Sequence, residues 1–430
     1  MNNTTDAQAL STAVDGGSVV RASRDGGDGK KPKRKRNYLL RNGYRQIDLK
    51  VINSYSEEQA LLRLQQVRWG HLGDGQQCCP KCGAVDAHYV CPSISGFKCR
   101  ACKRQFTVFS GTRLHSSKMS AKEVLSIALH FVEAKDGMSS RELSALHGRD
   151  YQTLHVMTLK IREAIRQTMA DEPKLQGKVQ ADAAYFIKYV RPGNVGTGAA
   201  LSAKRDQKNA GLDEDAKAKG TVSPNMCALV VFVQEAEGQA RRRYRIALIK
   251  TESQIEILPI AQDFCSQDCV LVTDQHGAYH VFSGEFEEHH QVNHAEEFMT
   301  SDGHHTNLAE GLFSRIRASV HGAWHRMSLQ NLVEYGWELC WRGEMVGMNN
   351  VYQLDDLLKR LLRSGRPTKF VDYWRKRADS EKVDPEQIGV VREIDKGLVP
   401  KKRGRPAKGV TRLKPPPRGD GARSASGATS

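Results

Sequence analysis

The sequence predicts a multidomain protein: an α+β module comes first, an all-α region second and an α/β domain third, with basic tails at both ends. Three observations predict this order. Two closely spaced cysteine pairs are typical of a small metal-braced module. Residues 120–170 have helical periodicity, and from Lys178 onward β-branched and aromatic segments alternate with turns. At 430 residues the chain also exceeds what one hydrophobic core usually organises.

The composition favours a polyanionic partner. Lys and Arg total 65 against 49 Asp and Glu, which gives a formal net charge of +16. Such a surplus favours binding to phosphates, although a basic protein without such a partner is the plainer alternative. No apolar run approaches the roughly 20 residues that cross a bilayer. The N-terminal residues lack the order of a secretory signal, and ten cysteines without a disulfide framework indicate a reducing compartment, so we expect a cytoplasmic protein without membrane contact.

The cysteine pairs predict a zinc ribbon that follows a helix. Cys79 and Cys82 form one CxxC pair, Cys99 and Cys102 form the other, and sixteen residues separate the pairs. Thiolates select zinc or iron, and a closed site of four thiolates is typical of structural zinc. Cys78 adjoins the first pair, but only Cys79 has the CxxC spacing. We therefore expect a zinc ion held by Cys79, Cys82, Cys99 and Cys102.

A helical region follows the ribbon. Ser120 can cap the segment AKEVLSIALHFVEAK, and Ser139 or Ser140 can begin SSRELSALHG. A turn at 148–150 then leads into the longer basic segment YQTLHVMTLKIREAIRQTM. A short helix, a Gly-containing turn and a longer basic helix fit a helix-turn-helix that binds DNA. A plain helical hairpin is an equally common explanation of the same pattern.

Three carboxylates mark the α/β region. Asp182 lies in the expected strand KVQADAAYF, Asp274 ends the expected strand CVLVTD, and Glu310 lies in the expected helix HHTNLAEGLFSRIR. Two further strands are expected in MCALVVFVQEA and RRRYRIALIKT. A lone Asp at a strand end is usually a turn residue. Carboxylates on two strands and a helix, however, can hold a pair of divalent cations for phosphodiester chemistry, and magnesium or manganese suits such oxygen ligands.

With these motifs the chain resembles the DDE-type insertion-sequence transposases that carry an N-terminal zinc ribbon, specifically the IS1595 group. The resemblance runs from about Arg68 to Arg342, and the segments CRACKRQFTVFSGT and HTN-x-x-E are its more specific parts. It implies a ribonuclease-H-like DDE domain that cuts double-stranded DNA at transposon ends and joins the freed 3′ hydroxyls to a target. It also implies catalytic Mg²⁺ or Mn²⁺, a homo-oligomer that pairs two ends, and a bacterial, nucleoid-associated location.

The resemblance further implies catalytic positions. Asp182 and Asp274 match the first two acidic residues of the group. Members of the group have either Asn or Glu at the third position, so Glu310 and Asn307 are the candidates. We favour Glu310, because an anionic ligand holds a divalent ion better than an amide does.

Three neighbouring residues complete this expectation. Arg317 lies two helical turns after the third acidic position and could contact phosphate, or it could be a solvated surface charge. His305 could orient the substrate or merely begin the helix. Relatives commonly carry Glu directly after the first Asp, where this chain has Ala183. Successive strand residues face opposite sides, so we expect Ala183 to be tolerated.

Basic segments are expected to extend beyond the folded domains. The run KKPKRKR at residues 30–36 is predicted to contact phosphate from a disordered arm. Near the C-terminus, Arg403 and Arg405 lie in an Arg-Gly-Arg-Pro segment that resembles an AT-hook, which lies in a narrow A·T minor groove. A generic basic tail is an equally good explanation of this segment.

The predicted function is therefore that of a DNA transposase that binds terminal inverted repeats and catalyses metal-dependent cleavage and strand transfer. The alternative is a catalytically inactive, transposase-derived regulator that only binds DNA. The predicted domains are a disordered basic arm (1–46), a helix plus zinc ribbon (47–112), a helix-turn-helix-like region (113–175), the catalytic domain (176–350) and a basic C-terminal region (351–430).

Overall fold

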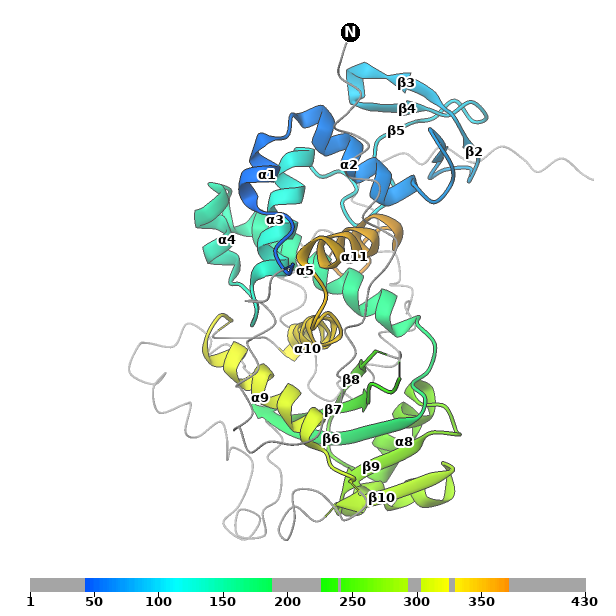
Figure 1. Ribbon diagram of the computed structural model, residues 1–430, viewed down its shortest axis with the longest axis vertical. Coiled ribbons are helices and arrows are strands. Elements are labelled where there is room, and N and C mark those ends of the chain that lie inside the picture. The colour runs from blue at the N-terminus through cyan, green and yellow to red at the C-terminus, as the bar shows by residue number, and fades with distance from the viewer. Residues whose placement is uncertain (1–42, 188–225, 239–240, 293–302, 325–328, 371–430) are drawn as a thin grey trace, which may run out of the picture. The chain divides into compact units, whose positions relative to one another are not determined.

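The computed structural model describes residues 43–187, 226–238, 241–292, 303–324 and 329–370 (Figure 1). The chain divides into the units Met1–Ile388 and Gly389–Ser430, and every described residue belongs to the first. The expected basic run at 30–36 and the AT-hook-like Arg403 and Arg405 lie outside the described residues. Within the described ranges, none of the helices combines the length and the apolar character that a membrane span needs.

Two short helices precede the cysteine pairs where the sequence predicts one. They are α1 (Leu49–Ser54) and α2 (Glu57–Trp69). The chain is extended at Tyr55 and Ser56, and the Ser56 side chain then accepts a hydrogen bond from the Gln59 backbone. The Ser56 backbone N–H in turn donates to the Gln59 side chain, which completes a capping box and fixes the start of the second helix.

The cysteine-rich segment forms two small antiparallel sheets. One contains β1 (Gln77–Cys78) and β2 (Val85–Asp86). The other contains β3 (Tyr89–Cys91), β4 (Gly96–Lys98) and β5 (Gln105–Phe106), and the 3-10 turn η2 (Pro92–Ile94) joins its first two strands. Trp69 at the end of α2 packs edge-on against two ring side chains of this sheet, Phe97 and Phe106. These three aromatic rings form the small apolar core of the ribbon.

The helical region forms α3 (Ala121–Glu133), α4 (Ser140–His147) and α5 (Tyr151–Ala170). Ser120 and Ser139 begin α3 and α4 with capping boxes, as the sequence predicts, and Asp150 caps α5. Gly148 ends α4 with φ +60°, a conformation that glycine adopts without strain. A three-residue turn therefore joins the short helix to the long one.

The α/β region is built on a five-stranded mixed sheet. Its strands are β6 (Lys178–Ile187), β7 (Met226–Gln234), β8 (Arg243–Ile249), β9 (Val270–Asp274) and β10 (Glu288–Val292), in the spatial order β10-β9-β6-β7-β8. The pairs β6–β7 and β7–β8 are antiparallel, whereas β9 is parallel to both β6 and β10. The first four strands are those that the sequence predicts. The sequence analysis missed β10, because its residues EHHQV are mostly polar.

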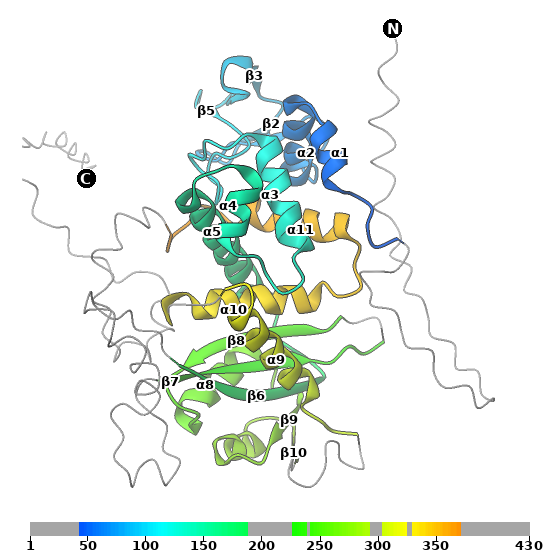
Figure 2. The same ribbon diagram turned by 90° about the vertical axis from the view of Figure 1, so that its left-hand side faces the viewer.

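Helices cover both faces of this sheet. On one face, α8 (Gln254–Phe264) and the 3-10 segment η3 (Gly277–Gly284) pack on a core that includes Val179, Ala181 and Phe232. On the other face lie α9 (Asn307–His321), which crosses β6 and β7, and α10 (Leu329–Glu344), which packs on β8 (Figure 2). Residues of β6 therefore alternate between two different environments.

A further helix, α11 (Asn350–Arg363), follows in the segment that was assigned to the basic C-terminal region. Its leucines repeat at helical spacing and are buried, and the helix contacts α2, α3 and α5. Residues 350–363 are therefore part of the folded helical region and not a tail.

Buried ion pairs fasten α5 to α10. The Arg162 guanidinium donates to the Glu338 carboxylate at 2.6 Å, and Arg342 donates to the same carboxylate at 2.7 Å. All three side chains are almost completely buried. Burial alone would raise the pKa of Glu338, but the two guanidinium groups outweigh it and hold that pKa below its ordinary value. Glu338 is therefore charged. Its ion pair with Arg162 joins α5 to α10, whereas its ion pair with Arg342 lies within α10.

Candidate metal centres

The four predicted cysteines form one compact group. Their Sγ atoms all lie within 4.8 Å of one another, with 3.7 Å between Cys79 and Cys102 and 3.7 Å between Cys82 and Cys99. Sulfurs bound tetrahedrally to zinc at the usual bond length are roughly 3.8 Å apart, so the group fits this ion. Cys78 is outside the group, and its Sγ lies 3.7 Å from the carbonyl oxygen of Gly83. The group therefore contains Cys79 and not Cys78, as the CxxC spacing predicts.

The two knuckles of the ribbon share one backbone geometry. The N–H of Gly83 donates to the Cys79 carbonyl at 2.9 Å, and the N–H of Lys103 donates to the Cys99 carbonyl at 3.1 Å. Both donors have positive φ, +73° for Gly83 and +60° for Lys103. This turn brings the two thiols of each pair together. Gly83 suits its position, whereas Lys103 adopts a conformation that is uncommon for residues with a side chain.

The first two predicted acidic residues lie level with each other on adjacent strands. The parallel register of β6 and β9 pairs Gln180 with Val272. Continued for two residues beyond this last pair, the same register sets Asp182 level with Asp274, whose negative charge acts on Asp182. Residues at the same level of parallel strands point to the same face of a sheet, so the topology brings these two carboxylates together.

The electrostatic environment of Asp182 reflects this proximity. Its pKa is raised to about 7, first by burial and then by the negative charge of Asp274, with smaller contributions from Glu252 and Glu310. A 2.8 Å hydrogen bond from the Ala183 N–H to the Asp182 carboxylate lowers the pKa only in part. The neighbouring carboxylates therefore disfavour the ionised form of Asp182. A bound divalent cation would offset this repulsion between negative charges.

The carboxylates are more widely spaced than the cysteines. Among the described residues, the cysteine group is the one set of possible ligands whose atoms all lie within 4.8 Å of one another. A site for two cations spans a larger volume, because the ions themselves are about 3.5–4 Å apart.

Helix α9 carries both candidates for the third position. Asn307 is its first residue and Glu310 lies one turn later, and both side chains are exposed. The negative charge of Glu310 makes the smallest of the contributions that raise the pKa of Asp182. Arg317 is exposed two turns further along. His305 precedes the helix, with its Nδ1 atom 2.9 Å from Nε2 of Gln180.

Ala183 lies on the opposite face of β6 from Asp182. It packs, together with Tyr185, against the core that α8 and η3 cover. A larger acidic side chain at this position would point away from Asp274. This geometry agrees with the expectation from strand alternation that Ala183 is tolerated.

Sequence reasoning missed a fourth carboxylate, Glu252, in the loop between β8 and α8. Its side chain is only 9% exposed, and its Oε1 lies 3.8 Å from Nδ1 of His276. Its backbone N–H donates to the Tyr185 hydroxyl at 3.0 Å. Burial raises the pKa of Glu252, the buried Tyr279 hydroxyl and His276 lower it, and Asp274 raises it again. The sequence TES gives no sign of this placement, because it reads as the ordinary start of a helix.

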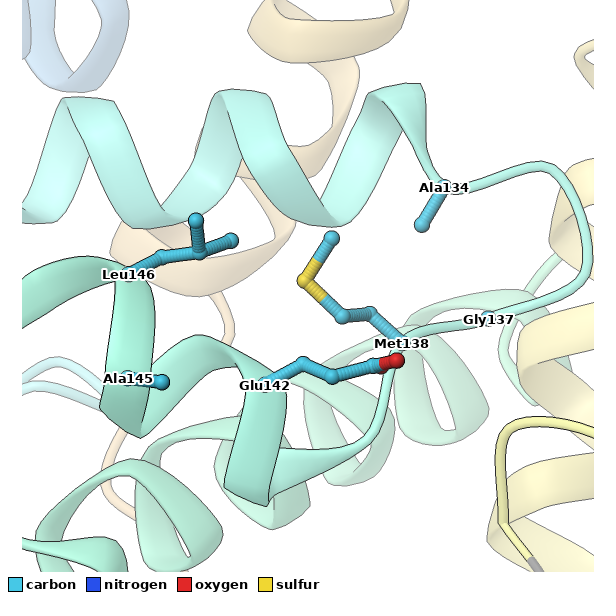
Figure 3. Close-up of a pocket in the computed structure, with 6 residues that line it drawn as sticks. All are labelled: Ala134, Gly137, Met138, Glu142, Ala145 and Leu146. Atoms are coloured by element: carbon cyan, nitrogen blue, oxygen red, sulfur yellow. The ribbon is translucent and has the colours of Figure 1, made fainter.

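Two pockets of the described surface lie away from the predicted metal ligands. One, of about 540 Å³, opens between the end of α3 and α4, and Met138, Glu142 and Leu146 are among the residues that line it (Figure 3). Another of about 540 Å³ lies where the segment before α3 meets the start of α5, lined by Lys118 and Lys160 among others. Neither includes a predicted ligand of either metal.

Comparison with known families adds an independent observation. Residues 174–344 match the ISXO2-like transposase domain, and residues 55–105 match the transposase zinc-ribbon domain. The chain carries both domains of the IS1595-group transposases. The resemblance seen in the sequence is thereby confirmed. None of the curated proteins matches the chain significantly.

The two matched ranges of this transposase coincide with the zinc ribbon and with the α/β region of the structure. The zinc-ribbon match includes all four clustered cysteines. The transposase-domain match includes the whole five-stranded sheet, α8, α9 and α10, and with them the four acidic residues described above. The helices α3, α4 and α5 lie between the two matches.

We expect purified transposase to contain zinc, and we expect Cys99→Ser to lose it. Because a structural zinc site stabilises the fold only when all of its ligands are present, this variant should unfold several degrees below the wild type. Metal analysis together with thermal denaturation measures both effects. Cys78→Ser is the matched control and should keep its zinc; a Cys78 variant without zinc would overturn the ligand assignment.

The raised pKa of Asp182 predicts that, without magnesium or manganese, ionised Asp182 lowers the free energy of unfolding of the transposase, by an amount that depends on pH. The folded pKa of about 7 exceeds the unfolded value, so the folded state binds the extra proton and stability falls as the pH rises from about 4 to 7. Asp182→Asn should therefore raise the free energy of unfolding at about pH 8, on the order of 2 kcal/mol, and raise it less at about pH 5. Denaturant titrations at both pH values measure the difference. An equal effect at the two pH values would contradict the assignment.

Proposed function

We propose that this chain is an active DNA transposase of an insertion sequence, which binds terminal inverted repeats, hydrolyses the strand at each end and joins the freed 3′ hydroxyl to a target. The observation that carries the proposal is the placement of Asp182 level with Asp274, with the charge of Glu310 nearby, inside a transposase domain. Such a group of carboxylates is suited to metal-dependent phosphodiester chemistry.

The proposed catalytic core has the ribonuclease-H-like fold that the resemblance implies. The mixed sheet supports this proposal, because three consecutive antiparallel strands are extended by two parallel ones and helices cover both faces. The acidic pair then lies on the two neighbouring strands at the junction between the antiparallel and parallel parts.

In the proposed mechanism, Asp182, Asp274 and Glu310 hold magnesium or manganese, with Asn307 as the alternative third ligand. Carboxylate oxygens are the ligands that these hard cations prefer. When bound, the cations supply the positive charge that activates an attacking hydroxyl and offsets charge on the leaving oxygen. The protein's own part is to hold its carboxylates at fixed positions, so that little reorganisation is needed when the phosphate reacts.

Arg317 is proposed to contact a phosphate of the bound strand. It is exposed on α9, two turns beyond Glu310, where a guanidinium group can form two hydrogen bonds to one phosphate. His305 instead makes its described contact with Gln180, which favours a role in the structure around the start of α9 over direct contact with the substrate.

The ribbon is proposed to bind the DNA ends through a basic and aromatic surface. Tyr89 and Val90 are 52% and 72% exposed on β3. The Arg100 guanidinium carbon lies 5.1 Å from the centre of the Tyr89 ring, Lys103 Nζ lies 5.9 Å from it, and Lys98 pairs with Tyr89 across the sheet. Cationic groups around an exposed aromatic ring suit a phosphate backbone with nearby sugars or bases.

We also propose that α4 and α5 act as a helix-turn-helix. The first three residues of α5, which include Tyr151, are exposed, whereas most of the rest of the helix is buried against α4, α10 and α11. In a helix-turn-helix, the first residues of the second helix contact base edges. Because two DNA ends must be joined to one target, the proposed active form is a homo-oligomer.

The proposal predicts that Asp274→Asn abolishes magnesium-dependent nicking of DNA that carries the element ends. Loss of a carboxylate that holds the cations should cost several kcal/mol of transition-state stabilisation, roughly 100-fold or more in rate. The assay compares the nicking rates of the wild type, Asp274→Asn and, to distinguish the third ligand, Glu310→Gln and Asn307→Ala. Gel-shift binding should be retained by all of them.

The control for this experiment is a variant that is defective in DNA binding but keeps its carboxylates. Arg100→Ala combined with Lys103→Ala should weaken DNA binding and reduce its salt dependence without altering the carboxylates. A wild-type protein that binds the ends but never nicks them, with either magnesium or manganese, would favour the DNA-binding regulator.

A further inference from the structure

We propose that Gln180 is a positioning residue that caps helix α9 from strand β6 and thereby sets the place of Glu310 relative to Asp182. No family match assigns a role to this side chain. The catalytic consequence of the cap rests on the proposed function, whereas the cap itself is a property of the fold and can be tested separately.

Helix α9 lacks the cap that most helices receive from the residue before them. The first N–H groups of a helix have no partner within the helix and need one elsewhere. Thr306 precedes α9, but its side chain makes no capping hydrogen bond. The N–H of Leu308, the second residue of the helix, donates instead to Oε1 of Gln180 at 2.9 Å. A strand of the sheet therefore caps the helix.

The amide of Gln180 is held in a single orientation. Its side chain is completely buried. Nε2 donates to Oε1 of Glu235 at 2.7 Å and lies 2.9 Å from Nδ1 of His305, while Oε1 accepts from Leu308. Turning the amide over would place donors against the Leu308 N–H and an acceptor against the Glu235 carboxylate. Glutamine alone among side chains of this length supplies the acceptor and both donors.

The partners of Gln180 are themselves fixed. Lys178, two residues earlier on β6, lies 3.8 Å from the Glu235 carboxylate. It also donates to the carbonyl of Gly303 at 3.0 Å, in the segment that leads to α9. The side chains of Lys178, Gln180 and Glu235 thus connect the ends of β6 and β7 to three consecutive parts of the approach to the helix: Gly303, His305 and Leu308.

The position of Gln180 explains why this cap matters for the site. Gln180 and Asp182 are two residues apart on β6 and face the same side, and Leu308 and Glu310 are two residues apart on α9. A single buried amide therefore links the strand that carries the first carboxylate to the turn of helix that carries the third. Catalytic groups must be held to within about 0.5 Å, and a misplacement of about 1 Å can reduce a rate roughly 100-fold.

The cap is tested first by hydrogen exchange of the full-length, zinc-bound protein. Gln180→Ala should speed the exchange of peptides that cover the first turn of α9, with little change in α10. Gln234→Ala is the matched control, because Gln234 also accepts a backbone N–H, but from Gln176 and not from a residue of α9. Unchanged exchange in α9 of the Gln180 variant would overturn the cap.

A charge exchange tests the same geometry without a cavity. Gln180→Glu keeps an acceptor for Leu308 but places a carboxylate against Glu235, so it should also speed exchange at the start of α9. Combining it with Glu235→Gln restores a donor and an acceptor to this pair, and protection should return. Failure of the double variant to regain protection, in a protein that is otherwise folded, would count against the cap.

Activity tests the positioning role. In magnesium titrations of nicking, Gln180→Ala should need a higher magnesium concentration for half-maximal rate and should lose roughly 10-fold to 100-fold in maximal rate, with DNA binding unchanged. If the wild type does not nick DNA, the proposed function fails, and the hydrogen-exchange experiments alone decide whether Gln180 caps α9. If the wild type nicks and the variant has the same magnesium dependence and rate despite faster exchange in α9, the positioning role is wrong.

Discussion

The parallel pairing of β6 with β9 is the constraint on which the candidate active site depends. Because side chains alternate along a strand, a shift of one residue in this register would turn Asp274 to the opposite face and separate it from Asp182. The register is stabilised by the apolar core on the face of the sheet that α8 and η3 cover, where Val179, Ala181 and Leu271 are completely buried. The same pairing brings together carboxylates that repel one another, as the raised pKa of Asp182 shows. Packing on the apolar face of the sheet thus stabilises the pairing of β6 with β9. On the polar face, repulsion between the carboxylates destabilises this pairing unless cations bind.

The rest of the molecule fixes the elements around this pair. Helix α9 is tied to β6 through Gln180, and α10 lies beside it on β8. The buried charges of Arg162 and Glu338 then join α10 to α5, at the start of which a short run of side chains is exposed. Removing one member of such a buried pair leaves an uncompensated charge, so this contact favours one arrangement of the two helices. The proposed DNA-reading surface and the proposed catalytic surface are therefore connected through packed helices.

The parts that could be predicted from the sequence are those with a local physical cause. The CxxC spacing fixes the thiol geometry, Ser120 and Ser139 cap helices through neighbours three residues away, and β-branched runs such as that of β7 form buried strands. The parts that were missed depend on distant residues. The polar strand β10 forms because β9 offers it an edge, and α11 is buried by helices far away in the chain. Glu252 and Gln180 owe their placement to the meeting of separate loops and strands, and neither belongs to a motif.

The central claim is that Asp182, Asp274 and Glu310 hold catalytic cations. Anomalous diffraction from crystals of the transposase grown with Mn²⁺ tests it most directly, because manganese can be distinguished from zinc by the choice of wavelength. The account predicts manganese bound by both Asp182 and Asp274, with Glu310 or Asn307 completing the ligands, and zinc at the four cysteines. Manganese bound elsewhere, or an acidic pair that shares no ion at saturating concentration, would contradict it.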